Sequence, residues 1–242
     1  MISDTLLVNT LIIFTLSIVG IIPVLAGFRF TDKNIDAVLG FSGGVMVAVS
    51  FSMIYETSEG ILQPLFFAAG FTVMWILEAI VPHEHMIKGY EGPVFFRKKF
   101  KMTWLIAFSM ILHNIPEGLT VGSSTIINQA LGFSTAMSIG LQDIVEGIMA
   151  GLPYIIVGKR VPALLLSLLA ASAEAGAALA SGYIGTLYKG LNAILAGVSS
   201  GAMVFIVVHE IIPETHKEHS SESTIGVLLG VVAALLLEYY LG

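Results

Sequence analysis

The chain has no cysteine and little charge. Charged residues make up 12% of its 242 residues and hydrophobic residues 56%, whereas a soluble domain is about 25% charged. Without cysteine there is no disulfide, and a metal site must use nitrogen and oxygen ligands. The few basic residues are scattered, so nothing indicates nucleic-acid binding. This is the composition of an integral membrane protein, whose surroundings are the lipid bilayer.

The apolar stretches are continuous rather than alternating, which predicts an all-α membrane protein and not a β-barrel. The first residues lack the basic region and cleavage site of a secretory signal, so the first stretch is expected to be a retained span. Short connections predict one transmembrane domain, 1–242. Eight transmembrane helices are expected, each of about 19 residues or more, at 5–28, 36–57, 61–81, 102–124, 130–157, 162–187, 190–213 and 223–241.

The basic residues predict how the chain is oriented in the membrane. Ten of the eleven lie in the connections after the first, third, fifth and seventh spans, and only Lys189 lies on the other side. Basic residues concentrate in cytoplasmic loops. We therefore expect a multi-pass protein of the cell membrane with both termini extracytoplasmic.

Two similar polar runs lie in the middle of consecutive spans. His113-Asn114-Ile115-Pro116-Glu117-Gly118 is followed by Gln142-Asp143-Ile144-Val145-Glu146-Gly147. In each run a glutamate comes four residues after a potential metal ligand, on the same face of the helix. Glu174 is the only carboxylate of the span 162–187 and lies at its centre. Three helices are thus expected to bring polar groups to one depth.

Four of these groups are carboxylates, and no lysine or arginine lies in a span centre to pair with them. Each costs ~3 kcal/mol at membrane depth, so protonation or bound cations must compensate. Two divalent ions would balance four negative charges. One imidazole with carboxylate and amide oxygens suits Zn²⁺, Fe²⁺ or Mn²⁺ better than Cu(I). Interhelical hydrogen bonding is the alternative, and it accounts less well for a whole set at one depth.

The run HNIPEG in the fourth span, its relative in the fifth and the eight short-looped spans resemble the ZIP (Zrt/Irt-like) family of divalent metal transporters. The resemblance implies an inverted repeat of helices 1–3 and 6–8, and the echo of Ser42-x-Gly44-x-Met46-Val47 in Ser199-x-Gly201-x-Met203-Val204 agrees with it. It also implies a binuclear midplane site and transport of divalent metal into the cytoplasm, Zn²⁺ first, then Fe²⁺, Mn²⁺ or Cd²⁺. No cofactor is implied. Carried over, one site is His113, Glu117, Gln142 and Glu146, and the other is Asn114, Asp143 and Glu174, with Glu117 and Glu146 bridging.

The second run departs from the commonest family pattern, His-Asn-x-Pro-Glu-Gly, because it has Gln142, Asp143 and Val145. This leaves the metal preference open. Separately, the predicted orientation places a group of histidines near the inner ends of the third and seventh spans. We expect these residues to line an exit path: His83, His85, His209 and Glu210.

Two other classes compete with a metal transporter. An intramembrane metalloenzyme is disfavoured, because His209-Glu210 runs into Pro213 with no second histidine and no Glu-x-x-His occurs. A proton-coupled carrier of another solute would not need ligands four residues apart. We therefore expect a transporter and not an enzyme. Proton coupling, a channel-like or alternating-access mechanism, and a homodimer all remain open.

Overall fold

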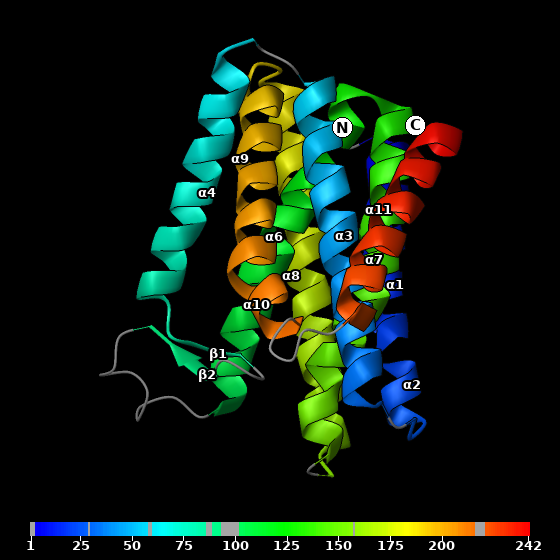
Figure 1. The fold of residues 1–242 in the computed structure, drawn as a ribbon. Coiled ribbons are helices and arrows are strands. Elements are labelled where there is room, and N and C mark those ends of the chain that lie inside the picture. Colours follow the sequence, from blue (N-terminus) through cyan, green and yellow to red (C-terminus); the bar gives the residue numbers. More distant parts are fainter. Residues whose placement is uncertain are drawn as a thin grey trace.

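The computed structural model describes residues 3–28, 30–57, 60–85, 89–92, 102–156, 158–215 and 221–242. Over these residues it is a bundle of long helices with one short two-stranded antiparallel ribbon (Figure 1). The helices are α1 (Asp4–Gly20), α2 (Ile22–Leu25), α3 (Asp32–Glu56), α4 (Leu62–Ile80), α6 (Met102–Ile127), α7 (Gln129–Ile156), α8 (Arg160–Leu187), α9 (Leu191–Ile206), the π-helical turn η1 (Val207–Ile211), α10 (Ile212–Thr215) and α11 (Ser221–Leu241). The ribbon is β1 (His83–His85) with β2 (Gly89–Glu91).

The prediction of an all-α membrane protein is confirmed. Each of the eight predicted segments coincides, within four residues at either end, with a long helix or an interrupted helix. Among the described residues, six of these helices are long and apolar enough to cross a membrane. The helices α6 and α7, which carry the two polar runs, have 26 and 28 residues.

Proline interrupts two segments that were expected to be continuous helices. Pro23 has no N–H to give to the carbonyl of Val19, and α1 ends before it, with α2 following. The ring of Pro213 would collide with the carbonyl of His209 in a regular helix, and the wider π turn directly precedes it. Pro116, by contrast, lies within an unbroken α6.

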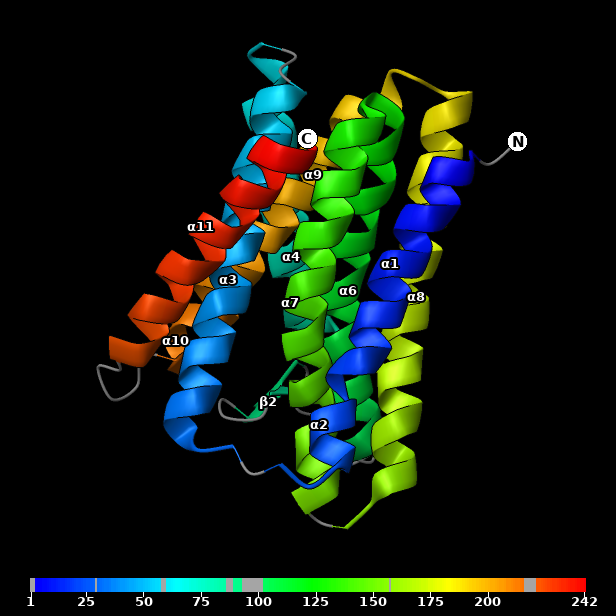
Figure 2. The ribbon, with the colours of Figure 1, turned by 90° about the vertical axis from the view of Figure 1, so that its right-hand side faces the viewer.

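The long helices form two groups. The most extensive pairs are α1 with α7 and α6 with α8 in the first group, and α3 with α11 and α4 with α9 in the second. In Figure 2 the helices α3 and α11 lie on one side of α6 and α7, while α1 and α8 lie on the other. An inverted repeat relates α1 to α8, α3 to α9 and α4 to α11, and it exchanges α6 with α7. Under this exchange the pair α1–α7 becomes α8–α6, and the pair α3–α11 becomes α9–α4. This is the pairing that the inverted repeat predicts.

Each of the four helix pairs has a glycine at its point of close approach. A Cβ added at any of these glycines would lie 2.4 Å or less from a carbonyl oxygen of the partner helix. Two of them directly follow the glutamates of the polar runs, so they allow α6 to approach α8 at Glu174 and α7 to approach α1 at Ser17. The four contacts are Gly118 to Glu174, Gly147 to Ser17, Gly44 to Val227 and Gly201 to Phe67.

Replacing Gly118 by alanine is expected to destabilise the protein and to displace Glu174. The new Cβ would lie 2.1 Å from the Glu174 carbonyl oxygen, and helix backbone cannot yield cheaply. Thermal unfolding of the protein in detergent should show a clearly lowered midpoint. Gly176→Ala is the matched control, because a Cβ there meets nothing within 4 Å. Equal midpoints for the two variants would contradict this account of the α6–α8 contact.

Candidate metal site

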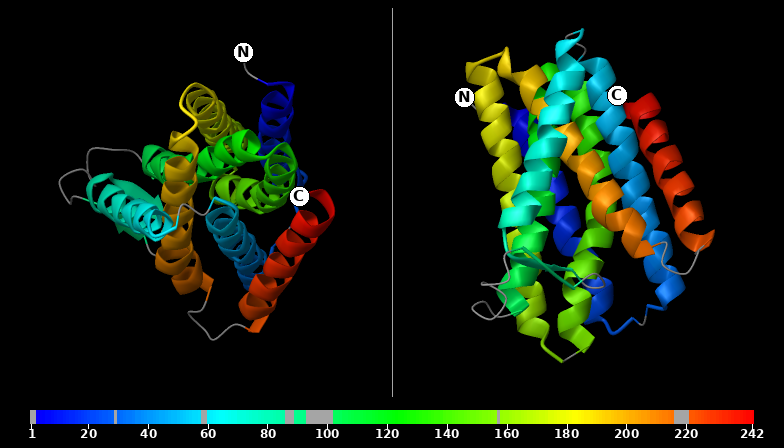
Figure 3. Two further views of the ribbon diagram at one scale, coloured as in Figure 1. Left: turned by 90° about the horizontal axis from the view of Figure 1, so that it is seen from above. Right: turned by 60° about the vertical axis from the view of Figure 1, so that its left-hand side comes forward.

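Three carboxylates from three helices of the first group converge in the centre of the bundle. Glu117 on α6, Asp143 on α7 and Glu174 on α8 each offer an oxygen, and these oxygens lie within 4.8 Å of one another. All three side chains are 0% exposed. Seen down the helix axes in Figure 3, α6 and α7 lie between the remaining helices of the two groups. Three of the four predicted carboxylates therefore lie together at the centre of the bundle.

Amide and hydroxyl groups surround the three carboxylates but do not satisfy them. The Gln142 side-chain amide donates to Glu117 Oε1 at 2.5 Å, and Ser17 Oγ on α1 donates to Glu174 Oε2 at 3.1 Å. Asn114 lies against Glu174. Among the described residues, the buried atoms of this set with no hydrogen-bond partner are Asn114 Oδ1, Glu117 Oε2, Gln142 Oε1, both Asp143 oxygens, Glu146 Oε2 and Glu174 Oε1.

Such a concentration of unpaired oxygens is costly without a cation. Burying a polar group without a hydrogen bond costs about 1–3 kcal/mol, and far more for an ionised carboxylate. Seven buried oxygens of this set have no partner, and all of them are potential ligands for a hard or borderline divalent ion. The arrangement therefore has the chemistry of a cation-binding site.

Glu146 lies at the edge of this set and is half-buried. Its Oε1 is 3.4 Å from the Gln142 amide nitrogen, and it lies beside Glu117. It also contacts Ser42 of α3, which belongs to the second helix group. No signal in the sequence identified Ser17, because serine is frequent in these spans, and the sequence pointed to Ser42 only as part of the internal repeat and not as a neighbour of the site.

His113 faces a second cluster, one helical turn from Glu117. Its Nε2 lies 2.8 Å from Glu210 Oε1 of η1, and Glu78 of α4 completes a group of three potential ligands. The His113 side chain is 17% exposed. The histidine expected in the midplane site thus lies between that site and Glu210, which was expected on the exit path.

Glu78, His113 and Glu210 are called the inner cluster below. His209, which precedes Glu210 in the chain, also lies at this cluster. His209 Nε2 is 3.4 Å from Glu78 Oε2, and its ring stacks on Phe205 with the centroids 4.9 Å apart. Its side chain is 42% exposed. The π turn places His209 and Glu210 side by side against Glu78. The contact of Glu78 with His113 could not be predicted, because nothing in the spacing of the sequence links the two residues.

Of the two other histidines expected on the exit path, the structure describes the side chain of His83 but not that of His85. His83 is 0% exposed, and its Nδ1 lies 2.7 Å from the carbonyl oxygen of Val81. Its strand, β1, packs against α6. His85 is in the same strand, but its side chain lies outside the described residues, as do His216 and His219.

Glu117, Asp143 and Glu174 are called the midplane cluster below. The two ends of the bundle differ in how completely they shield this cluster from solvent. Toward the end of the bundle that holds both termini, a layer of buried apolar side chains lies about one turn beyond the polar residues. Toward the opposite end lie the half-buried Glu146 and the partly exposed His113 and His209. The cluster is therefore closed on the side of the termini in this structure. The apolar layer includes Met46, Val49, Val121, Ile139 and Met203, each 5% exposed or less.

The fold and the cluster define an all-α integral membrane protein with a buried group of carboxylates, all of them potential ligands for a cation. The chain belongs to the ZIP zinc transporter family, whose model matches residues 83–238. It is 33% identical to the zinc transporter GufA of Myxococcus xanthus, over 98% of each chain. It is 31% identical to the zinc transporter ZIPB of Bordetella bronchiseptica, over 95% of this chain and 79% of that one. It is 32% identical to the zinc transporter ZupT of Chlorobium luteolum, over 86% and 87%. The family and these relatives are transporters and not enzymes.

Proposed function

We propose that this protein carries Zn²⁺ across the cell membrane into the cytoplasm through a two-ion site at the membrane midplane. The observation that carries the proposal is the convergence of Glu117, Asp143 and Glu174 with unpaired oxygens, in spans whose centres contain no lysine or arginine. All three relatives are named as zinc transporters, which supports Zn²⁺ as the principal substrate. Fe²⁺, Mn²⁺ and Cd²⁺ are expected to compete, because most of the ligands are oxygens.

In the proposed arrangement the two ions share carboxylates. One ion is held by Glu117, Gln142 and Glu146, with His113 completing the set. The second is held by Asn114, Asp143 and Glu174. Glu117 and Glu146 lie beside each other, so each has an oxygen for either ion. The second ion has only oxygen ligands and is expected to be bound more loosely than the first.

The inner cluster provides the next binding position on the way to the cytoplasm. His113 lies within reach of Glu210 and is one turn from Glu117. An ion that leaves the midplane can therefore exchange Glu117 for Glu210 and Glu78 while His113 remains a ligand. His209, on the exposed side of Glu78, is the following ligand toward solvent.

Uptake into proteoliposomes tests this function. Purified protein should accumulate radioactive Zn²⁺ inside the vesicles, saturably and above protein-free vesicles. Measuring with and without a pH gradient separates proton coupling from passive flow. No accumulation above empty vesicles in either condition would refute the proposal.

The orientation carries a separate prediction, and the absence of cysteine makes it simple to test. A single cysteine at Lys189 should react with an impermeant thiol reagent in intact cells, whereas one at Ser221 should not. Both positions are exposed at opposite ends of the bundle, and the basic residues place the Ser221 end in the cytoplasm. Labelling of position 221 but not of 189 would reverse the orientation and the direction of transport.

A further inference from the structure

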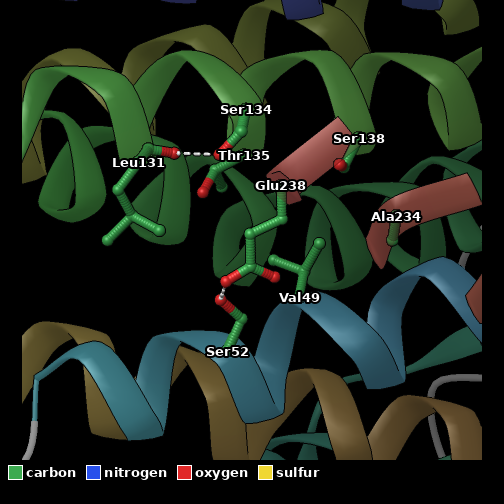
Figure 4. A pocket seen from close by; sticks show the side chains of 8 residues that line it. All are labelled: Val49, Ser52, Leu131, Ser134, Thr135, Ser138, Ala234 and Glu238. Carbon is green, nitrogen blue, oxygen red and sulfur yellow. Dashed lines mark hydrogen bonds between the residues drawn. The ribbon is translucent and has the colours of Figure 1, made fainter. Parts of the chain in front are cut away.

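A polar pocket lies toward the end of the bundle that holds the termini, and the apolar layer, which includes its lining residue Val49, lies between it and the midplane carboxylates. Figure 4 shows Glu238 of α11 turned into this pocket between α3 and α7. The hydroxyl of Ser52 donates a hydrogen bond to Glu238 Oε1. The pocket is lined by Val49, Ser52, Leu131, Ser134, Thr135, Ser138, Ala234 and Glu238.

Two hydroxyls of α7 face this pocket without a partner. Serine and threonine in helices commonly donate to a carbonyl one turn back, as Ser134 does to Leu131 at 2.9 Å. Thr135 and Ser138 make no hydrogen bond within the described residues, although they are only 4% and 2% exposed. Both line the pocket from α7, on the side opposite Ser52 (Figure 4). Their oxygens are therefore available to a ligand in the pocket.

The donor set indicates the kind of ligand. The pocket offers one carboxylate and several neutral hydroxyl oxygens, and none of its lining residues is basic or carries nitrogen or sulfur in its side chain. Oxygen-only sites favour hard cations over Zn²⁺. A single negative charge with neutral oxygens matches a monovalent ion.

We propose that this pocket binds an alkali cation, with Na⁺ as the probe. Glu238 supplies the charge, and Ser52, Thr135 and Ser138 supply neutral oxygens. The ion then connects α7 of the first helix group to α3 and α11 of the second, at the end where the apolar layer closes the midplane cluster. Binding is expected to stabilise the structure in this closed arrangement.

The direct measurement is retention of radioactive Na⁺ by purified protein in equilibrium dialysis, with choline chloride keeping the ionic strength constant. The wild type should retain Na⁺ and should unfold about 2–4 °C higher in NaCl than in choline chloride. Glu238→Gln should lose both effects. Glu222→Gln is the matched control, because it makes the same change on the same helix at a partly exposed position paired with Lys33, and it should retain Na⁺ as the wild type does.

Two further variants keep the result interpretable. Thr135→Val with Ser138→Ala keeps the carboxylate and removes two oxygens, so it should weaken Na⁺ retention at least tenfold even if Glu238→Gln folds poorly. Glu117→Gln should retain Na⁺, which separates this pocket from the transport site. The proposal is wrong if the wild type retains no Na⁺, if Glu238→Gln retains it unchanged, or if micromolar Zn²⁺ displaces it.

Discussion

Replacing Glu117 by glutamine is expected to abolish Zn²⁺ uptake and to weaken zinc binding at the midplane by more than about 100-fold. The substitution keeps the size of the side chain but removes the charge and one ligand oxygen. Loss of a group that only supports a metal ligand already costs 10–100-fold, and Glu117 is proposed to contact both ions. Zinc binding by calorimetry and uptake into proteoliposomes measure the two effects.

The neighbouring carboxylates provide a graded comparison for this experiment. Asp143→Asn and Glu174→Gln each remove charge from the second ion only, so they should keep one bound zinc and part of the uptake. Glu222→Gln, partly exposed in the first turn of α11 and distant in sequence from both runs, should change neither. If Glu117→Gln binds zinc as the wild type does, the shared-carboxylate arrangement is wrong.

Replacing Glu210 by glutamine should reduce the maximal uptake rate by about 10-fold or more while zinc binding at the midplane is largely kept. Glu210 touches His113 at 2.8 Å but lies outside the group formed by Glu117, Asp143 and Glu174. Its removal takes away the acceptor for an ion that leaves the midplane, not the site that first holds it. Uptake measured over a range of Zn²⁺ concentrations separates the rate from the apparent affinity.

Two controls distinguish this role from a general loss of structure. His209→Ala should have a smaller effect, because His209 is nearer to solvent and the His113–Glu210 contact stays intact. Glu210→Asp should recover part of the rate, since it restores the carboxylate on a shorter side chain. A Glu210→Gln protein with wild-type rate and reduced zinc binding would instead place Glu210 in the midplane site.

The helices and the midplane residues could be predicted from the sequence because each depends on local pattern. Long apolar runs bounded by polar residues define the spans, and the four-residue spacing in each polar run places a glutamate on the face of its potential metal ligand. The depth of Glu174 followed from its position at the centre of its span. These features need no knowledge of how the helices pack.

What the sequence could not provide depends on packing between distant helices. The contact of His113 with Glu210 joins residues 97 positions apart, and no local pattern signals it. The same holds for Ser17 with Glu174, 157 positions apart, and for the place of Glu78 in the inner cluster. The π turn before Pro213 was also missed, because proline predicts an interruption but not its geometry.

The central claim is that Glu117, Asp143 and Glu174 hold transported metal. Crystals of the zinc-loaded protein, measured on both sides of the zinc absorption edge, test it most directly. Two anomalous peaks are expected in the centre of the bundle, one bounded by Glu117, Gln142 and Glu146 and the other by Asn114, Asp143 and Glu174. Anomalous density confined to the inner cluster or to the protein surface, with the three central carboxylates empty at saturating zinc, would contradict the account.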